Sequence, residues 1–324
     1  MAAAAAQIKL DETLDYIAEL DARNIKEACE GLGTDDTALT DILCNRSKDQ
    51  IKRIDAQYKK LCGQTLLDQI RAECSGHYKR FLRFLVASPA EAAADALFKA
   101  MDGVGTSERI LSEIIVTSCN ADLRVIQQRY QEKYDQSLLD HVCSEVGGDY
   151  EAFLVQCLKC ERQEGAAPDE ALAEEQVTRL IKAAKGFGCN ESEFIDILGK
   201  SSIAQTDLIE QTYQRREGKS LAKLIEGEMG GALEWAMLLR LENELDAKCW
   251  LLRFAMKGAG TSEDIIARVL GGAEKEEAMA IQARYDEKYS RSLTADLNEE
   301  VSGNLLAALL KWLQPPKVGY FARS

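Results

Sequence analysis

The chain has 324 residues, of which 46% are hydrophobic and 29% charged, and its formal net charge is −14. This acidic balance argues against a nucleic-acid-binding protein, which needs a basic surface. At first sight it also argues against binding to an anionic membrane, which attracts basic segments and repels acidic ones. The length indicates about two domains or a repeat protein, and no apolar run approaches the ~18–20 residues of a membrane span.

Residues 1–23 form the first segment, an N-terminal arm. Ile8, Leu14 and Ile17 give it a partial helical period, which favours a helix on the protein's own core or a frayed terminus. The first residues lack the basic and long apolar stretches of a secretory signal. Ten cysteines suit a reducing compartment. Together these features predict a cytoplasmic protein.

The remainder of the chain is a fourfold repeat, marked by four Gly-x-Gly sequences whose second glycines are 72, 83 and 72 residues apart. Fixed offsets from these second glycines lead to the same residue type each time: Tyr at 25, Leu at 33, Glu at 40 and Gly at 43. Such self-similarity is the signature of a repeat architecture. The distal glutamates at offset 40 are Glu73, Glu145, Glu228 and Glu300.

The predicted order is repeat 1 (24–87), repeat 2 (88–160), a linker (161–173), repeat 3 (174–244), repeat 4 (245–313) and a tail (314–324). Apolar residues recur at helical spacing in each repeat, and alternation typical of strands is absent. Ser88-Pro89 is a typical helix start. We therefore expect an all-α protein with about five helices per repeat. The longer connection after repeat 2 predicts two pairs of repeats, separated by the linker.

The Gly-x-Gly turn can present backbone carbonyls to a hard cation, because glycine leaves the backbone uncovered. In repeat 4 these are the carbonyls of Met256, Gly258 and Gly260, to which the distal Glu300 carboxylate could add two oxygens. Ca²⁺ takes six to eight oxygen ligands, so one or two positions stay open for water or phosphate. No EF-hand, P-loop or dinucleotide motif is present. Glycines that merely end helices are the alternative, but they leave the four distal glutamates unexplained.

Four repeats of about seventy residues with Gly-x-Gly-Thr, acids and a distal glutamate resemble the annexins, from about residue 25 to residue 313. The most specific motif of this resemblance is the sequence Met256-Lys257-Gly258-Ala259-Gly260-Thr261. The resemblance implies a curved disc with calcium loops on its convex face and reversible docking on anionic phospholipid. By position it implies these main calcium ligands: Cys29, Gly31, Gly33 and Glu73; Met101, Gly103, Gly105 and Glu145; Ala184, Gly186, Gly188 and Glu228; Met256, Gly258, Gly260 and Glu300.

The resemblance also implies secondary calcium sites that use the acid three residues after each second glycine: Asp36, Glu108, Glu191 and Glu263. Two positions that are often basic in the family are basic only in the second half of this chain, as Lys185, Lys219, Lys257 and Arg291. We therefore expect repeats 3 and 4 to bind lipid phosphate more directly than repeats 1 and 2 do. Repeat 3 departs from the pattern at Cys189, where the family usually has Thr. The loop tips Leu32, Val104, Phe187 and Ala259 either contact headgroups or pack within the turn.

Catalysis and a scaffold role are the alternatives to membrane binding. Catalysis is not expected, because His77 and His141 occupy non-equivalent repeat positions without a motif-level nucleophile. A cytoskeletal or scaffold protein built on the same repeats stays open, and the family often binds a partner protein through the N-terminal arm. The net charge does not exclude a membrane, since one Ca²⁺ per main loop would cancel more than half of it.

Overall fold

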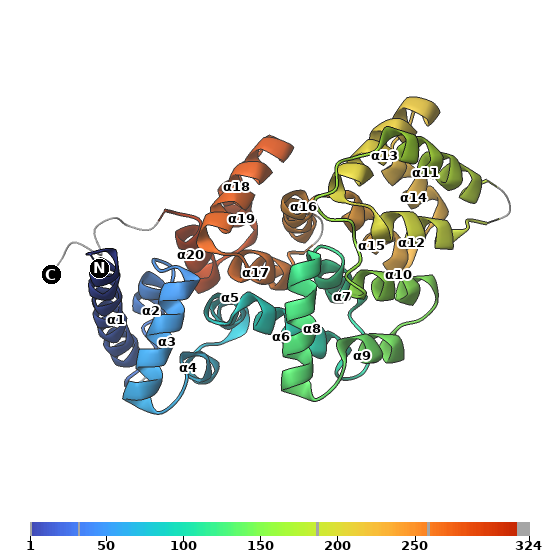
Figure 1. Ribbon diagram of the computed structural model, residues 1–324. Coiled ribbons are helices and arrows are strands. Elements are labelled where there is room, and N and C mark those ends of the chain that lie inside the picture. The colour runs from blue at the N-terminus through green and yellow to red at the C-terminus, as the bar shows by residue number, and fades with distance from the viewer. Residues whose placement is uncertain (1, 32, 186–187, 258–259, 316–324) are drawn as a thin grey trace. The chain divides into compact units, whose positions relative to one another are not determined.

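The computed structural model describes residues 2–31, 33–185, 188–257 and 260–315, with the backbone alone for residues 2–10. Over these ranges the chain forms twenty α-helices and no strand (Figure 1). Five helices fall in each repeat, which confirms the predicted all-α class. None of the helices in the described ranges is long and apolar enough to cross a membrane.

The helices follow one order in every repeat. Repeat 1 contains α1 (Ala2–Ala28), α2 (Asp36–Leu43), α3 (Lys48–Cys62), α4 (Leu66–Glu73) and α5 (Gly76–Val86). Repeat 2 contains α6 (Pro89–Met101), α7 (Glu108–Ile115), α8 (Asn120–Tyr134), α9 (Leu138–Glu145) and α10 (Gly148–Leu158). Repeat 3 contains α11 (Glu170–Ala183), α12 (Glu191–Lys200), α13 (Ile203–Glu217), α14 (Leu221–Glu228) and α15 (Gly231–Leu241). Repeat 4 contains α16 (Glu244–Met256), α17 (Glu263–Gly272), α18 (Lys275–Tyr289), α19 (Leu293–Glu300) and α20 (Gly303–Trp312).

The repeated residues have local structural roles. The tyrosine at offset 25 and the leucine at offset 33 are at most 2% exposed in all four repeats. A Ser or Thr just before that leucine accepts a hydrogen bond from the backbone N–H three residues on, and so caps the fourth helix. That helix ends at the distal glutamate in every repeat. The constant offset in the sequence therefore corresponds to a constant place in the structure, because each distal glutamate is the last residue of the fourth helix of its repeat.

The repeats associate in a different pairing from the one predicted. One compact unit contains residues 1–92 and 248–324, and the other contains residues 93–247. Unit 1 thus joins repeat 1 to repeat 4, where α5 packs on α17 and α2 packs on α20 (Figure 1). In unit 2, α10 packs on α12 and α7 on α15. The prediction of a first and a second pair along the chain is wrong, because the second and fifth helices bury their apolar faces reciprocally between these repeats.

Two buried lysines tie repeats 1 and 4 together inside unit 1. Lys48 Nζ donates to the carbonyls of Phe84 and Gly271, each at 2.8 Å. Lys275, at the equivalent position of repeat 4, donates to the Cys44 carbonyl at 2.7 Å and the Trp312 carbonyl at 3.0 Å. Each ammonium thereby satisfies at least one carbonyl of its own repeat and one of the other. Burial lowers the pKa of Lys48 to about 8.

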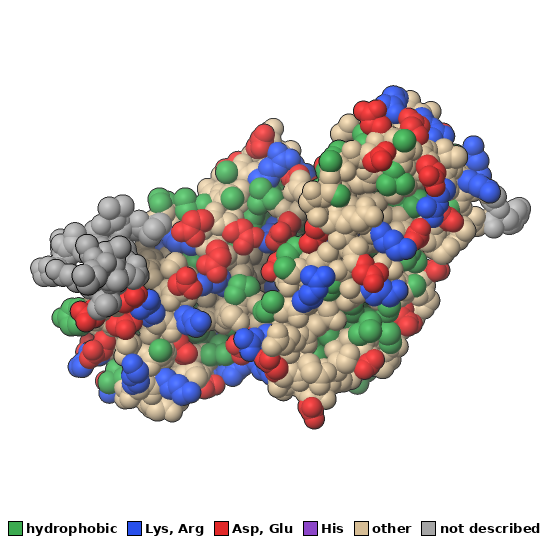
Figure 2. Space-filling model, viewed as in Figure 1, with side chains coloured by type: hydrophobic (Ala, Val, Ile, Leu, Met, Phe, Trp, Pro, Cys, Tyr) green, Lys and Arg blue, Asp and Glu red, His purple; other side chains and the backbone are tan. Residues whose placement is uncertain are grey.

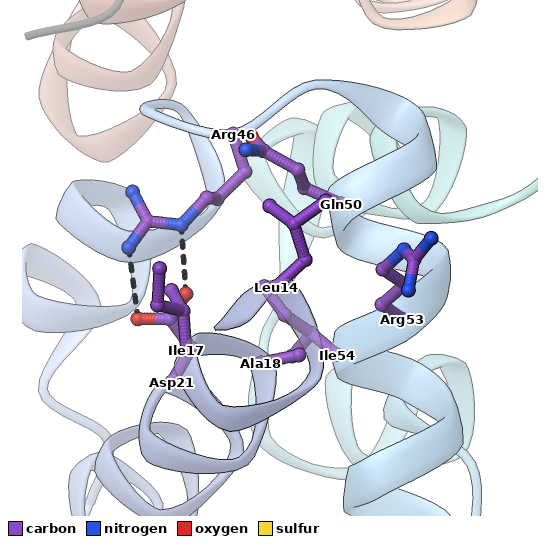
Figure 3. A pocket seen from close by; sticks show the side chains of 8 residues that line it. All are labelled: Leu14, Ile17, Ala18, Asp21, Arg46, Gln50, Arg53 and Ile54. Carbon is purple, nitrogen blue, oxygen red and sulfur yellow. Dashed lines mark hydrogen bonds and ion pairs between the residues drawn. The ribbon is translucent and has the colours of Figure 1, made fainter. Parts of the chain in front are cut away.

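The N-terminal arm is helical and continues into repeat 1 without a break. The predicted boundary at residue 23 lies inside α1, which packs on α3 and α2. Beneath α1 the Asp21 carboxylate receives two hydrogen bonds from the Arg46 guanidinium, at 2.7 and 3.0 Å, and both side chains are almost fully buried (Figure 3). The pocket around this pair has only about 10 Å³ of space, room for no more than one water. Burial of a hydrogen-bonded ion pair fixes how α1 sits on the repeat.

The two other predicted segments are the linker between repeats 2 and 3 and the C-terminal tail. Residues 159–169, between α10 and α11, form no helix, whereas the last four residues of the predicted linker (161–173) belong to α11. Most of the predicted tail, residues 316–324, lies outside the described residues. On the face drawn in Figure 2, acidic and basic side chains are intermixed.

The buried thiol of Cys44 gives an expected pH dependence of stability. Burial raises its pKa to about 12 from the ordinary 9.0, so between pH 9 and pH 12 the unfolded chain loses this proton first and the folded state loses stability. From pH 8 to pH 10 the free energy of unfolding should fall by about 1.4 kcal/mol more in the wild type than in Cys44→Ala. Urea unfolding at the two pH values measures this. Equal losses in the two proteins would contradict the expectation.

Candidate functional site

Each Gly-x-Gly loop is closed by the same backbone hydrogen bond. The N–H two residues after the second glycine donates to the carbonyl five residues before that glycine, as Asp35 to Ala28, Ser107 to Ala100, Asn190 to Ala183 and Ser262 to Ala255, at 2.8–2.9 Å. The bond joins the end of the first helix to the start of the second. A tight loop of uniform size therefore stands at the same place in all four repeats.

The loop glycines have a backbone conformation that other residues rarely adopt. In repeat 2, Gly103 has φ 128° and Gly105 has φ 86°, and a side chain at either position would be strained. Gly31, Gly33, Gly188 and Gly260 have positive φ as well, whereas Gly186 and Gly258 lie outside the described residues. The glycines are thus more than helix ends, since they turn the backbone twice in three residues.

The distal glutamate returns to the loop of its own repeat. Thr106 Oγ1 donates to Glu145 Oε2 at 2.8 Å, and Thr261 donates to Glu300 at 2.5 Å. In repeat 1 the corresponding contact from Thr34 to Glu73 is 3.2 Å. The threonine directly follows the second glycine, so three glutamate carboxylates lie at their loops. The sequence analysis does not predict this contact, although the recurrence of the threonine in three repeats is visible in the sequence.

Repeat 3 has a thiol where the others have this threonine. Burial, together with the neighbouring negative charges of Glu191, Glu228 and Asp149, raises the pKa of Cys189 to about 11. Glu228 is therefore close enough to act on Cys189 electrostatically. A neutral thiol is a weak donor, so Glu228 is held less firmly than the other three glutamates.

The oxygens gathered at the loops fit a hard cation. Among the described residues, no backbone N–H hydrogen-bonds to the carbonyl oxygens of Cys29, Gly31, Gly33, Met101, Gly103, Gly105, Ala184, Gly188, Met256 or Gly260. No three His, Cys, Asp or Glu side chains converge as a metal site in the described parts of the chain. A cation at these loops would therefore draw most of its ligands from carbonyls, with one carboxylate each. All-oxygen ligation of this kind suits Ca²⁺.

The predicted secondary acids all begin a helix. Asp36, Glu108, Glu191 and Glu263 are the first residues of α2, α7, α12 and α17. Burial raises the pKa of Asp36, and nearby Asp35 adds to this effect, while Asn304 opposes it. Asp36, Glu73 and Glu263 are among the residues that line one open cleft of about 280 Å³ within unit 1. The structure thus brings acids of repeats 1 and 4 to a shared cleft.

The four basic residues predicted to grip phosphate differ in their surroundings. Lys185, Lys219 and Lys257 are exposed, and no carboxylate pairs with them among the described residues. Arg291 instead forms an ion pair with the buried Asp296, at 2.5 Å, and also approaches Glu299. Its role at phosphate stays a prediction, but its charge is already engaged. Among the loop tips Val104 is fully exposed, whereas Leu32, Phe187 and Ala259 lie outside the described residues.

The two histidines lie in unrelated surroundings. His141 Nδ1 is 2.6 Å from the Tyr130 hydroxyl in unit 2. His77 contacts Glu263 and Asp264 in unit 1, at 3.1 and 2.8 Å.

Comparison with known proteins identifies the family. The family model described as Annexin matches four segments, residues 20–85, 92–156, 175–239 and 246–312. Annexin A13 of Homo sapiens is 34% identical over 297 residues, 90% of this chain and 94% of the relative. Annexin A5 of Homo sapiens is 31% identical over 294 residues, 90% and 92% of the two chains.

The architecture agrees with that assignment. The solved structure of annexin III matches with a TM-score of 0.84 at 31% identity, covering 91% of this chain and 93% of that one. The sequence match and the fold both extend over nearly the entire chain. This chain therefore belongs to the annexins, a family that binds phospholipid in a calcium-dependent way.

Proposed function

We propose that this chain docks reversibly on anionic phospholipid membranes through calcium held at its Gly-x-Gly loops. The observation that carries the proposal is the contact between each loop threonine and the distal glutamate, as in Thr106 with Glu145. It supports a site in which loop carbonyls and one carboxylate act together. Calcium would supply a positive charge that bridges these oxygens and a lipid phosphate.

The charge at each loop explains why the binding of lipid and the binding of calcium should strengthen each other. One carboxylate per main site predicts weak binding of calcium alone, on the order of 10⁻⁴–10⁻³ M. A lipid phosphate at the open position strengthens calcium binding, and calcium strengthens lipid binding by the same factor. Several loops acting together add avidity of roughly 10²–10⁴. The acidic chain would then be peripheral on membranes only when calcium is raised.

Co-sedimentation with vesicles tests this function. The full chain should pellet with phosphatidylserine-containing vesicles in the presence of Ca²⁺ and return to the supernatant when a chelator is added. It should remain in the supernatant with neutral phosphatidylcholine vesicles. Pelleting that survives the chelator at moderate salt would contradict the proposal. Calorimetry with Ca²⁺ and acidic vesicles separates it from a pure scaffold role, for which no coupled heat is expected.

The exposed lysines give a second expected result. Replacing Lys185 and Lys257 together by alanine should weaken binding to acidic vesicles, because each lysine near an anionic surface contributes about 1 kcal/mol. The matched control replaces Glu30 and Asp102, the equivalent residues of repeats 1 and 2, by alanine. Vesicle titration at fixed calcium measures both. Unchanged binding of the lysine variant, beside altered binding of the control, would show that repeats 3 and 4 do not grip phosphate in this way.

Three further expectations belong to this proposal. We expect no catalytic activity and a cytoplasmic location. A protein partner at the N-terminal arm remains a prediction, for which Tyr16 and Leu20 are the candidate contacts, since they are 62% and 42% exposed on α1.

A further inference from the structure

The secondary acids of unit 1 are each held by a side chain from the opposite repeat. His77 of repeat 1 places Nε2 3.1 Å from Glu263 of repeat 4. Asn304 of repeat 4 donates to Asp36 of repeat 1 at 2.5 Å. We call these two pairs the cross-repeat contacts. His77 and Asn304 are both 44 residues after their second glycines, and Asp36 and Glu263 are both three residues after theirs, so the contacts are reciprocal.

The residues around the cross-repeat contacts form further hydrogen bonds and ion pairs. His77 Nδ1 is 2.8 Å from Asp264, which also pairs with Arg80. Burial alone would raise the pKa of Asp264, but Arg80 and His77 together lower it. In repeat 1 the Tyr78 hydroxyl donates to the Asp36 carbonyl at 3.0 Å and so supports the start of α2. Glu263 and Asp36 are therefore each in contact with a polar side chain of the other repeat.

The cross-repeat contacts are weak enough for a divalent cation to displace. The side chain of His77 is 42% exposed and that of Glu263 is 33% exposed, and contacts at such exposure contribute little to stability. The cleft beside them is open and is lined by Asp36, Glu73 and Glu263. A cation entering this cleft meets carboxylates whose partners can turn away into solvent.

Unit 2 lacks the cross-repeat contacts. The equivalent positions are Asp149 and Ala232, which cannot donate a hydrogen bond to an acid. In the described part of unit 2, no side chain donates to the carboxylates of Glu108 or Glu191. The secondary acids of unit 2 are thus free to take a cation without first losing a partner.

From this difference we infer that His77 and Asn304 are positioning residues that oppose calcium binding at the secondary sites of unit 1, each by contacting the acid of the other repeat. Calcium at Glu263 displaces His77 of repeat 1, and calcium at Asp36 displaces Asn304 of repeat 4. The secondary sites of unit 2 bind calcium first as its concentration rises. This inference rests on the proposed function, because it assumes that these acids bind calcium.

Calcium titration of the full chain by calorimetry tests the inference. To observe unit 1 alone, Glu108, Glu145, Glu191 and Glu228 are replaced by glutamine. In this background His77→Ala with Asn304→Ala should bind calcium about two- to fivefold more tightly, the factor expected for losing a competing surface contact. His77→Gln, which keeps a donor for Glu263, should behave like the parent and so separates the contact from a general loss of histidine.

The reverse test introduces a cross-repeat contact into unit 2, which lacks one. With the corresponding acids of unit 1 (Asp36, Glu73, Glu263 and Glu300) neutralised instead, Ala232→Asn should weaken calcium binding at Glu108 by a similar factor. If the parent proteins bind calcium and both sets of variants leave the affinity unchanged, the inference is wrong and the proposed function stands. If wild-type protein binds neither calcium nor acidic vesicles, the proposed function fails, and the inference fails with it.

Discussion

Replacement of the four distal glutamates by glutamine is expected to abolish calcium-dependent binding to acidic vesicles. Each substitution keeps the size of the side chain and one carbonyl oxygen but removes the only carboxylate of a main site. A loop that must hold Ca²⁺ with carbonyls alone lacks a compensating charge. Each single variant should raise the calcium requirement of its loop by at least about tenfold, and the fourfold variant loses avidity as well.

The control for this experiment must match the change of charge. Four exposed glutamates outside the loops, Glu19, Glu132, Glu175 and Glu287, can be changed to glutamine together. This variant gains the same charge as the loop variant and should still pellet with calcium. If the loop variant pellets as well as the control does, the distal glutamates are not calcium ligands.

Removal of the Asp21 carboxylate is expected to have the largest effect on stability. In Asp21→Ala the Arg46 guanidinium, 2% exposed in the wild type, loses its ionic partner beneath α1. Breaking a buried ion pair from one side costs about 3–5 kcal/mol, a large part of the total stability of a typical domain. Asp21→Leu with Arg46→Met removes both charges and should recover much of this loss.

Tryptophan fluorescence can report on the unit that contains this pair. Trp250 and Trp312 belong to unit 1, whereas Trp235 belongs to unit 2. In a Trp235→Phe background, urea unfolding followed by fluorescence therefore reports on unit 1. The exposed pair of Arg23 and Glu19 is the matched control, and Glu19→Ala should cost less than about 1 kcal/mol. A similar cost for the two pairs would contradict the role given to burial.

Features confined to one repeat could be predicted from the sequence. The offset of 40 residues identified Glu145 as a loop residue, and Thr106 is found beside it in the structure. The helix type followed from local spacing alone, because helical hydrogen bonds and amphipathic faces are local. The same local logic predicted a linker at residues 161–173, and the structure has no helix over residues 159–169.

Features that join different repeats could not be predicted in this way. The pairing of repeat 1 with repeat 4 depends on which apolar faces meet, and the linker length pointed to another pairing. The contact between His77 and Glu263 spans 186 residues and combines two unrelated offsets. The prediction for Arg291 at phosphate rests on a position that is often basic in the family, whereas its pairing with Asp296, five residues away, depends on side-chain geometry.

A structure of the protein with bound calcium tests the central claim most directly. Crystals grown with millimolar Ca²⁺ and a short-chain anionic phospholipid should contain an ion at the repeat 2 loop. We predict that it lies about 2.3–2.6 Å from the carbonyls of Met101, Gly103 and Gly105 and from the Glu145 carboxylate, the distances that Ca²⁺ takes to oxygen, with a lipid phosphate or water at the open position. Calcium bound elsewhere, with the Gly-x-Gly loops empty, would contradict the account.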